Sequence, residues 1–426
     1  MEIGRALRRA AMSGIPLVAP AGRRAALGLI AAAQIGAMST WFSAAAVATS
    51  LARDWHLAPA AVALLTVAVQ VGFVAGALVS AVSGIADVLP TRAVFVASAL
   101  VAAGVNGLLI GTGGDLRLAL PLRFLLGVFL AGVYPTGMKL MTGWFLQDRG
   151  LAIGILVGAL TLGAAFPHLV AGIGLAGLFS WPRVIAATSL GAVASAAIVA
   201  WFVRDGPYQA LPTRLDLGWA LRSLRDPALR LANLGYFGHM WELYAMWTWI
   251  PAFLLASVQT SDAAGGEAAG RWASLWAAAV IGAGAPGCVA AGLLADRLGR
   301  TVITAAAMAI SGSCAVATGL LFGKSPALVV AVAAAWGISV IADSAQFSAA
   351  ISELAEPDRV GSALALQTAM CFLLTAVSIQ LVPVLVSGAH WSQAFGVLAV
   401  GPALGTVAMV RLHGRPEAVR LAGGRR

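Results

Sequence analysis

Glu242 is the residue whose type and surroundings most directly indicate chemistry in this sequence, because it lies inside an otherwise apolar stretch. A carboxyl group within a membrane costs about 2.5 to 3.5 kcal/mol on insertion scales, so it needs either a partner or a function. His239 precedes it by one helical turn, and Met246 and Trp249 continue the stripe at helical spacing. Because a carboxyl can take up and release a proton, we expect Glu242 to couple proton movement, with His239 modulating it. Asp343, a second acid in an apolar stretch, joins them as a proton-coupling candidate.

Two other interpretations of Glu242 stay open. In the first, His239 or hydroxyl groups of neighbouring helices hydrogen-bond the carboxyl permanently, and its role is structural. In the second, His239 and Glu242 bind a metal ion, but no second His/Glu pair accompanies them. We expect no metal site and no cofactor.

A further group of residues is expected to contact a solute. Arg123 lies three helical turns before Tyr134 on the same face, so it is a candidate for holding an anionic group or for pairing with an acid of the other half. Alternatively, Arg123 extends to the outer membrane interface. His168 follows Pro167 and could instead only bond a carbonyl that the proline frees. The complete set of expected solute contacts is Gln34, Trp41, Arg123, Tyr134, His168, Trp249 and Gln346.

The composition excludes a water-soluble fold. Of the 426 residues, 60% are hydrophobic and 10% are charged, and the mean hydropathy is +0.90, whereas soluble domains carry about 25% charged residues. The net charge of +10 is spread over short clusters between apolar runs, so we expect no nucleic-acid partner. Three cysteines without CxxC spacing indicate neither a disulfide framework nor a zinc site.

The elements that position these residues are predicted to be membrane helices. A spanning helix needs about 20 apolar residues. Scanning at that length gives the spans 25–51, 61–84, 93–113, 118–142, 151–176, 184–203, 229–255, 272–295, 301–322, 326–350, 361–387 and 392–411. These runs lack the alternation of a barrel strand, so we expect an all-α integral membrane protein with twelve transmembrane helices.

Charge asymmetry sets the expected orientation. Twenty basic residues lie in segments on the side of the two termini, and five lie in segments on the other side. The positive-inside rule therefore places both termini in the cytoplasm, and we expect a multi-pass protein of the cytoplasmic (inner) membrane.

An internal repeat divides the chain near its middle. Met38 to Trp41 returns as Met246 to Trp249, Asp87 as Asp296, and Asp148-Arg149 as Asp358-Arg359, at offsets of 208 to 210 residues. The expected organisation is a cytoplasmic N-terminal segment (1–24), a six-helix bundle (25–203), a central cytoplasmic linker (204–228), a second six-helix bundle (229–411) and a cytoplasmic tail (412–426). Two pseudo-symmetric bundles suit the binding of a solute between them.

One loop carries a family resemblance. Gly292-Leu-Leu-Ala-Asp296-Arg297-Leu-Gly299-Arg300 resembles the GxLADRxGR motif of the major facilitator superfamily. Its counterpart in the first half keeps Gly84, Asp87 and a displaced Arg92 but loses the other motif residues, so the first-half gate departs from the pattern. Arg123 to Gly127 is similar to the family's RxxxG pattern, and the resemblance extends over the whole chain.

The resemblance implies a secondary transporter that works by alternating access. In that scheme the acids of the two loops hold arginine partners and lock one conformation. The expected gate residues are Gly84, Asp87, Arg92, Arg149, Gly292, Asp296, Arg297, Gly299, Arg300 and Arg359. The alternative is that these charges only set topology.

Within the family, Gly238-His239-Met-Trp-Glu242 and Ala342-Asp343-Ser344-Ala-Gln346 resemble the bacterial small-anion and cyanate-type branch. We therefore expect proton-coupled uptake of a small organic or inorganic anion by a monomer, with the solute, protons and the bilayer as partners. A proton-driven drug or metabolite efflux antiporter of the same fold is the alternative. A membrane-embedded enzyme is disfavoured because no GxSxG, HExxH or P-loop motif is present. A channel or sensor is disfavoured because no filter-like loop or Arg-rich sensor helix is visible.

Overall fold

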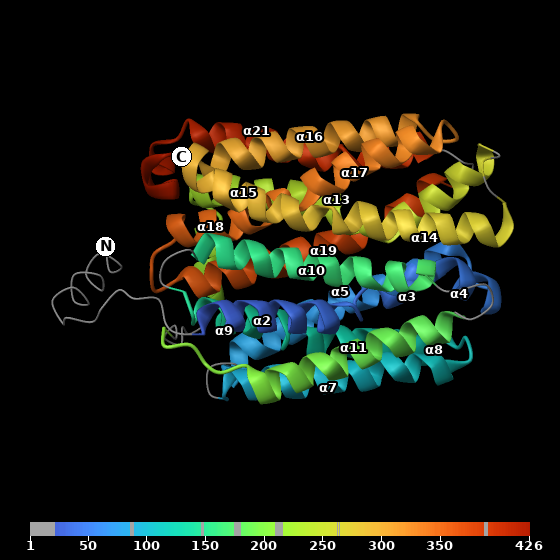
Figure 1. Ribbon diagram of the computed structural model, residues 1–426. Coiled ribbons are helices and arrows are strands. Elements are labelled where there is room, and N and C mark those ends of the chain that lie inside the picture. The colour runs from blue at the N-terminus through green and yellow to red at the C-terminus, as the bar shows by residue number, and fades with distance from the viewer. Residues whose placement is uncertain are drawn as a thin grey trace.

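The structure is a computed structural model, and it describes residues 22–85, 89–145, 149–173, 180–208, 216–261, 263, 265–386 and 391–426. All regular elements in these ranges are helices (Figure 1). The first half contains α2 (Arg23–Met38), α3 (Ser43–Ala46), α4 (Ala48–Asp54), α5 (Pro59–Ser83), α7 (Thr91–Leu108), α8 (Leu116–Leu130), α9 (Tyr134–Thr142), α10 (Arg149–Ile173) and α11 (Trp181–Phe202).

The second half follows the short helix α12 (Leu217–Ser223). It contains α13 (Pro227–Thr260), α14 (Gly266–Gly282), α15 (Gly284–Leu298), α16 (Arg300–Leu320), α17 (Pro326–Ala342), α18 (Ser344–Leu354), α19 (Val360–Val386), α20 (Trp391–Leu398) and α21 (Val400–His413). A 3₁₀ segment, η1 (Leu109–Thr112), follows α7, and another, η2 (Pro416–Gly424), follows α21.

The all-α membrane fold predicted from the sequence is confirmed for the described residues. Ten helical segments among them are long and apolar enough to cross a membrane, and they coincide with ten of the predicted spans. The first predicted span corresponds to the interrupted run α2 to α4, and the seventh corresponds to α13. The helices are thus consistent with twelve spans.

Local sequence explains where several helices begin. Asp226 caps α13, because its side chain accepts hydrogen bonds from the backbone N–H groups of Ala228 (2.8 Å) and Leu229 (3.0 Å). Pro227 then occupies the first helical position, where a missing N–H costs nothing. Proline also opens α5 and α17, at Pro59 and Pro326.

The helices form two bundles, the first from α2 to α11 and the second from α13 to α21. Their most extensive contacts are α5 with α19 and α10 with α14 and α15, and α10 also meets α18 and α3 meets α13. The repeat offset relates the two most extensive contacts to each other, since it maps α5 onto α14 and α15, and α10 onto α19. Within the first bundle, α5 and α8 approach so closely that a Cβ atom at Gly72 or Gly127 would collide with the backbone of the other helix. The close approach therefore requires glycine at both positions.

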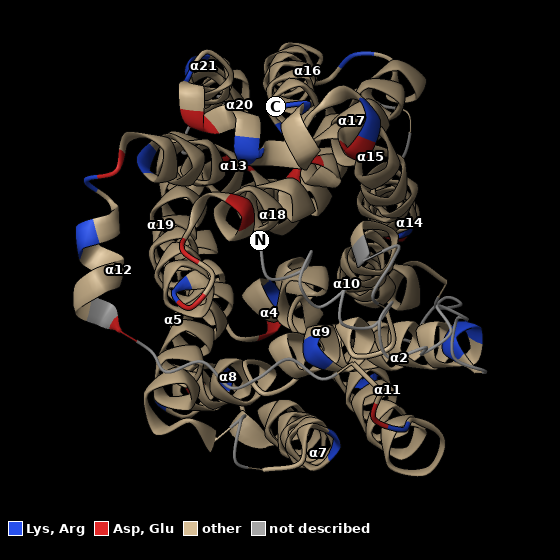
Figure 2. Ribbon diagram, turned by 90° about the vertical axis from the view of Figure 1, so that its left-hand side faces the viewer, with Lys and Arg blue, Asp and Glu red and all other residues tan. Residues whose placement is uncertain are grey.

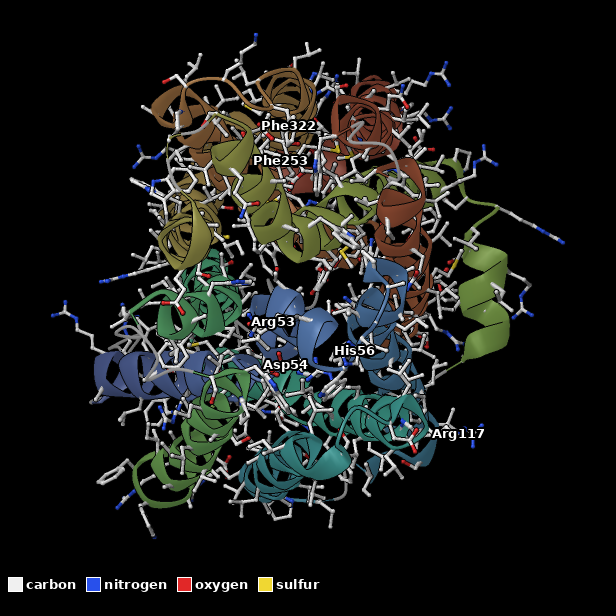
Figure 3. All side chains as sticks on the ribbon, turned by 90° about the vertical axis from the view of Figure 1, so that its right-hand side faces the viewer. Arg53, Asp54, His56, Arg117, Phe253 and Phe322 are labelled. Carbon is white, nitrogen blue, oxygen red and sulfur yellow. The ribbon has the colours of Figure 1, made fainter. Side chains whose placement is uncertain are left out.

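Charged residues lie at both ends of the molecule. We call one end of the molecule, on the left in Figure 1, the terminal end. The starts of α2 and α10, the end of α15 and the C-terminus gather there. Figure 2 looks onto this end and shows Lys, Arg, Asp and Glu around the helix termini. Figure 3 looks onto the opposite end, where Arg53 and Asp54 form an exposed ion pair at 3.0 Å.

Several membrane helices are interrupted within their length. The first span breaks after Met38, and α8 and α9 are separated by residues 131–133. At the repeat-related position, α17 and α18 are separated by Asp343 alone. Irregular backbone inside a membrane leaves N–H and C=O groups unpaired unless other parts of the protein bond them. Side chains that bond these backbone groups are therefore expected at such breaks.

Candidate functional site

Glu242 lies inside the second bundle with both carboxyl oxygens bonded. Its side chain is buried, Oε2 accepts a hydrogen bond from Ser311 Oγ on α16 (2.7 Å), and Oε1 accepts one from Trp336 Nε1 on α17 (2.8 Å). This is the hydroxyl-bonded arrangement that the sequence left open as an alternative. The proton-coupling role of Glu242 stays a prediction, and its partners tie α13 to α16 and α17.

His239 contacts Asp343 instead of Glu242. Nδ1 of His239 and Oδ1 of Asp343 are 2.7 Å apart, and both side chains are 1% exposed. The atoms are not aligned as a hydrogen bond, so the contact is that of an ion pair when the imidazole is protonated. The imidazole stacks on Tyr236 (centroids 5.6 Å apart, planes at 12°) and contacts Phe347. Its Nε2 has no hydrogen-bond partner among the described residues.

A cluster of aromatic rings joins the two bundles, and we call it the central aromatic cluster. It consists of Trp41, Phe42 and Phe73 from the first bundle and Tyr244, Trp247 and Phe372 from the second. The ring centroids of Trp41 and Phe372 are 5.6 Å apart. Phe42 packs edge-on against Trp247, with ring centroids 5.5 Å apart. Such ring pairs add about 0.5 to 1.5 kcal/mol each beyond the area that they bury. The centre of the molecule is therefore closed by contacts that must separate if the bundles rock.

A small void borders this cluster and has no room for a water molecule. It is lined by Met38, Trp41, Phe42, Leu160, Ala164, Tyr244 and Trp247. The indole N–H groups of Trp41 and Trp247 have no hydrogen-bond partner among the described residues. Two residues that line the void, one from each bundle, thus have a buried donor without a partner.

Other buried polar groups also lack partners within the described part of the chain. Both side-chain amide atoms of Gln34 on α2, Gln70 on α5 and Gln367 on α19 are unpaired, and so are both ring nitrogens of His168 on α10. Leaving such groups unsatisfied costs about 1 to 3 kcal/mol each. Gln34 and His168 were predicted solute contacts, whereas Gln70 and Gln367 were not among the predicted residues. A search for amides in apolar runs, in addition to ionisable residues, would have found both.

Arg123 is buried at the interruption of the first span. Its guanidinium donates to the carbonyl oxygens of Trp41 (2.6 Å), Leu65 (3.1 Å) and Thr40 (3.3 Å). It also donates to Ser43 Oγ (3.1 Å) and Asn106 Oδ1 (3.2 Å). The side chain is 1% exposed, so it does not extend to the membrane interface. In this conformation it supplies donors to two carbonyls at the interruption of the first span, Thr40 and Trp41, and to one inside α5.

The remaining predicted solute contacts lie in three different places. Trp249 donates its Nε1–H to the carbonyl of Ile379 on α19 (2.9 Å). Tyr134 is half-buried at the start of α9. Gln346 on α18 accepts a hydrogen bond from Arg300 (2.7 Å) and so belongs to the predicted gate.

Arg300 is the centre of that gate at the terminal end. It forms a bidentate pair with Glu353 (2.8 and 2.7 Å), and it lies 3.6 Å from Asp296. The carboxyl of Asp296 faces the first turn of α10 in the other bundle, since a Cβ atom at Gly150 would lie 3.0 Å from its Oδ2. A carboxylate at a helix N-terminus is favourable, so Asp296 links the bundles at this end.

The C-terminal residues pack on the same loop. The backbone N–H of Ala422 donates to Glu353 Oε2 (2.9 Å), and Arg425 donates to the carbonyl of Asp296. Gly299 has a φ of +103°, and a Cβ atom there would collide with the carbonyls of Arg425 and Arg426. Gly292 is buried in α15, and Arg297 is exposed.

The first-half counterpart of the gate differs. Asp87 lies outside the described residues, and Arg149 is described only as the first residue of α10. Gly84 ends α5 with a φ of +66°, and Arg92 donates to the carbonyl of Ala200 at the end of α11 (2.7 Å). Arg359 pairs with Asp216 beside α12 (2.6 Å). These described contacts hold helix ends and the linker.

Comparisons with known proteins agree with this architecture. The sequence matches the profile of the Major Facilitator Superfamily over residues 29–342. It is 27% identical, over 214 residues, to a probable sulfoacetate transporter, SauU, of Cupriavidus necator. That match covers 46% of this chain and 47% of the relative, so the chain spans about half the length of the curated relative it matches.

A solved structure shares the fold. A crystal structure of the nucleoside transporter NupG, in a mutant form, superposes with a TM-score of 0.71 over 92% of this chain and 99% of that one, at 12% identity. The profile match covers most of the chain and includes the loop from Gly292 to Arg300 on which the resemblance rested. The chain therefore belongs to the major facilitator superfamily, and its described residues form the helices of a multi-pass membrane protein.

Proposed function

We propose that this protein imports a small organic anion together with protons across the cytoplasmic membrane. The observation that carries the proposal is the set of unpaired hydrogen-bond donors buried in both bundles. Trp41 and Trp247, which line the void beside the central aromatic cluster, have unpaired indole N–H groups, and Gln34, Gln70 and Gln367 have unpaired amide groups on α2, α5 and α19. Oxygen atoms of a carboxylate or sulfonate accept hydrogen bonds from such donors.

The chemistry of the donors favours a small anion with few charges. Arg123 is already bonded to carbonyl and side-chain oxygens, so it supplies no spare donor set in this conformation. Neutral N–H groups then provide the recognition. The sulfoacetate named for the curated relative has the right groups, namely a sulfonate and a carboxylate.

Proton coupling is the second part of the proposal. Uptake of an anion runs against an inside-negative membrane potential, at about 2.3 kcal/mol per charge for each 100 mV, and accompanying protons remove this cost. Asp343, in contact with His239, is the proposed proton-binding carboxyl of the second bundle. Glu242, with both oxygens bonded, is proposed to hold α13 to α16 and α17. A symporter of this kind acts as a monomer in our proposal, because each chain carries both bundles.

The proposed orientation places the terminal end in the cytoplasm, with the basic residues of the sequence. The proposed gate there is the contact of Asp296 with the start of α10, supported by Arg300. Asp296→Asn should insert normally and slow transport, because the helix N-terminus loses its anionic partner. Unchanged turnover would leave these charges with a topological role only.

The test of the function is transport by purified protein in sealed vesicles with an imposed pH gradient. Small sulfonates, carboxylates, nucleosides and lipophilic cations are supplied separately, and proton uptake is followed with a dye. We expect an acid exterior to drive accumulation of a small sulfonate or carboxylate with simultaneous proton entry. Expulsion of a lipophilic cation in exchange for protons would instead establish the efflux antiporter.

A further inference from the structure

A groove runs along the side of the molecule where the two bundles meet. Helix α10 forms its floor, α2 of the first bundle forms one wall, and α15 of the second bundle forms the other wall. Figure 1 shows these helices one above another, with α10 between α2 and α15. The groove holds about 260 Å³ of free space, and all of its lining residues are apolar. It shares no residue with the void beside the central aromatic cluster, so it is a separate feature.

Small side chains create the groove and leave it open to the outside. Ala31 on α2, Gly158 on α10 and Ala285 on α15 all belong to its lining. A Cβ atom at Gly158 would lie only 3.2 Å from the carbonyl oxygen of Ala285, so α10 and α15 touch at the floor. Leu162 is 41% exposed, and Pro286 is also exposed. The groove therefore faces the surrounding membrane.

Both walls place the groove at the same depth. On α2 its residues come 7 and 11 positions after Arg24, and on α15 they come 8 to 12 positions before Arg297. Because a helix rises about 1.5 Å per residue, the groove lies about 10 to 18 Å from these arginines, which are at the terminal end. Half of a hydrocarbon core is about 15 Å thick. The groove thus lies among the acyl chains of the leaflet at the terminal end.

Each wall carries an exposed arginine on the face that borders the groove. Arg24 precedes Ile35 by 11 residues, and Arg297 follows Pro286 by 11 residues. Since 11 residues make about three helical turns, each arginine shares a face with its groove residue. Both arginines are exposed, and neither has a hydrogen-bond or ion-pair partner among the described residues. Positive charge therefore borders the groove at the level of the lipid headgroups.

The size and lining of the groove favour a single acyl chain as its occupant. One turn of an α-helix, about 10 Å across and 5.4 Å long, fills about 400 Å³, so a helix of a partner or of a second copy does not fit inside. Ordered water needs two to four polar partners, which the apolar lining does not offer. A hydrocarbon chain fits both the width and the lining. Basic residues between membrane helices bind anionic lipid headgroups.

We propose that this groove binds one acyl chain of an anionic phospholipid, whose negative headgroup lies between Arg24 and Arg297. The two walls belong to different bundles, so a rocking movement of the bundles changes the width of the groove. A lipid that fits the present width stabilises the present arrangement, in which Asp296 contacts the start of α10. The inference goes beyond the proposed function, because it assigns a lipid ligand and does not depend on the transported solute.

Lipid binding is measured on the full chain, purified in detergent, by native mass spectrometry. Phosphatidylglycerol and phosphatidylcholine with identical acyl chains are added at equal concentrations. We expect one phosphatidylglycerol per chain to bind in preference to phosphatidylcholine. Arg24→Gln and Arg297→Gln should each lower the affinity for phosphatidylglycerol about fivefold, the usual contribution of one basic residue near anionic lipid. Arg117→Gln is the matched control, an exposed arginine at the opposite end (Figure 3), and should bind like the unmodified chain.

A second set of variants fills the groove and keeps both arginines. Ala31→Phe and Val289→Phe narrow it from opposite walls. Each should lower the affinity for phosphatidylglycerol at least about tenfold, since two buried methylene groups contribute that much. Ala194→Phe is the matched control, because Ala194 is exposed on α11 and does not line the groove. It should leave binding unchanged.

Three results would overturn the proposal. They are equal binding of the two lipids by the unmodified chain, undiminished phosphatidylglycerol binding in both groove-filling variants, and undiminished binding in both arginine variants. A dimer that dissociates in Ala31→Phe would also overturn it, and would place a second copy in the groove. All variants are first compared by size-exclusion profile. If Ala31→Phe does not fold, Val289→Phe tests the same groove from the other wall.

Discussion

Glu242 and Asp343 are equally buried carboxyl groups of the same bundle, and they differ in their position along a helix and in their bonding partners. Glu242 lies in the middle of an uninterrupted helix of 34 residues, and both of its oxygens accept hydrogen bonds. Asp343 lies at a break between two helices, and its contact is a histidine that can gain or lose a proton. A carboxyl whose bonds are complete holds helices together, whereas one with a titratable partner at a junction can change the structure when its charge changes.

The largest effect is expected for Asp343→Asn. Proton-driven uptake should fall about 100-fold, the lower end of what a positioned proton-transfer group contributes, because the side chain can no longer bind the proton. Exchange of labelled for unlabelled solute, which needs no net proton movement, should persist. Glu242→Gln should reduce driven uptake by less than about threefold by the same reasoning. Equal losses of driven uptake in the two variants, measured in the same vesicles, would show that Glu242 and Asp343 do not differ in their role.

Arg123→Gln tests whether completed hydrogen bonding also marks a structural role for a cation. The substitution leaves the carbonyls of Thr40, Trp41 and Leu65 with fewer donors, so we expect a loss of about 2 kcal/mol in stability. Thermal unfolding in detergent measures that loss. Affinity should decline equally for anionic and neutral solutes. A decline confined to anions would show that Arg123 contacts the solute, as the sequence predicted.

Trp336→Phe removes one of the two hydrogen bonds to Glu242 and keeps the ring. We expect the free energy of unfolding to fall by about 1 kcal/mol. A hydrogen bond between membrane helices contributes somewhat less than this on average, and the carboxyl oxygen left without a donor adds a further cost. The double variant with Glu242→Gln should lose less than the sum of the single variants, because both remove the same contact. Full additivity in thermal unfolding would indicate that the bond contributes nothing.

The smallest effect is expected for the exposed carboxyl of Asp216, outside the membrane helices. The backbone N–H of Trp219 and the neighbouring Arg359 hold the pKa of Asp216 below its usual range. A carboxyl with a lowered folded-state pKa stabilises the protein above its unfolded-state pKa, and this contribution disappears as the pH falls through the folded-state pKa. Asp216→Asn should therefore destabilise slightly at neutral pH and not at strongly acidic pH. A uniform effect at both pH values would refute this account.

The sequence predicts the fold well because membrane burial leaves a strong local signal. Runs of about 20 apolar residues can only be helices, and the repeat between Met38 and Met246 already indicated two related halves. The interruption of the first span was not predicted, since residues 39–42 contain neither proline nor glycine. The interruption is stabilised by Arg123, which lies about 80 residues further along the chain and donates to the carbonyl oxygens of Thr40 and Trp41.

The candidate site was harder to predict for the same physical reason. His239 and Glu242 are one turn apart, so the sequence suggested that they act together. Ser311 on α16 and Trp336 on α17 bond Glu242, whereas Asp343, between α17 and α18, contacts His239. The packing of these helices against α13 decides which side chains are in contact. Helical spacing identifies residues that share a face approximately, but it does not identify what lies opposite them.

The packing of the last residues against Gly299 has a practical consequence for anyone who handles this protein. An affinity tag or fluorescent fusion joined to Arg426 would begin beside the loop from Asp296 to Arg300 and would crowd the parts whose movement is to be observed. An insertion at Gly265, where no other atom lies within 4 Å of an added side-chain carbon, sits at the opposite end of the molecule and leaves that loop undisturbed.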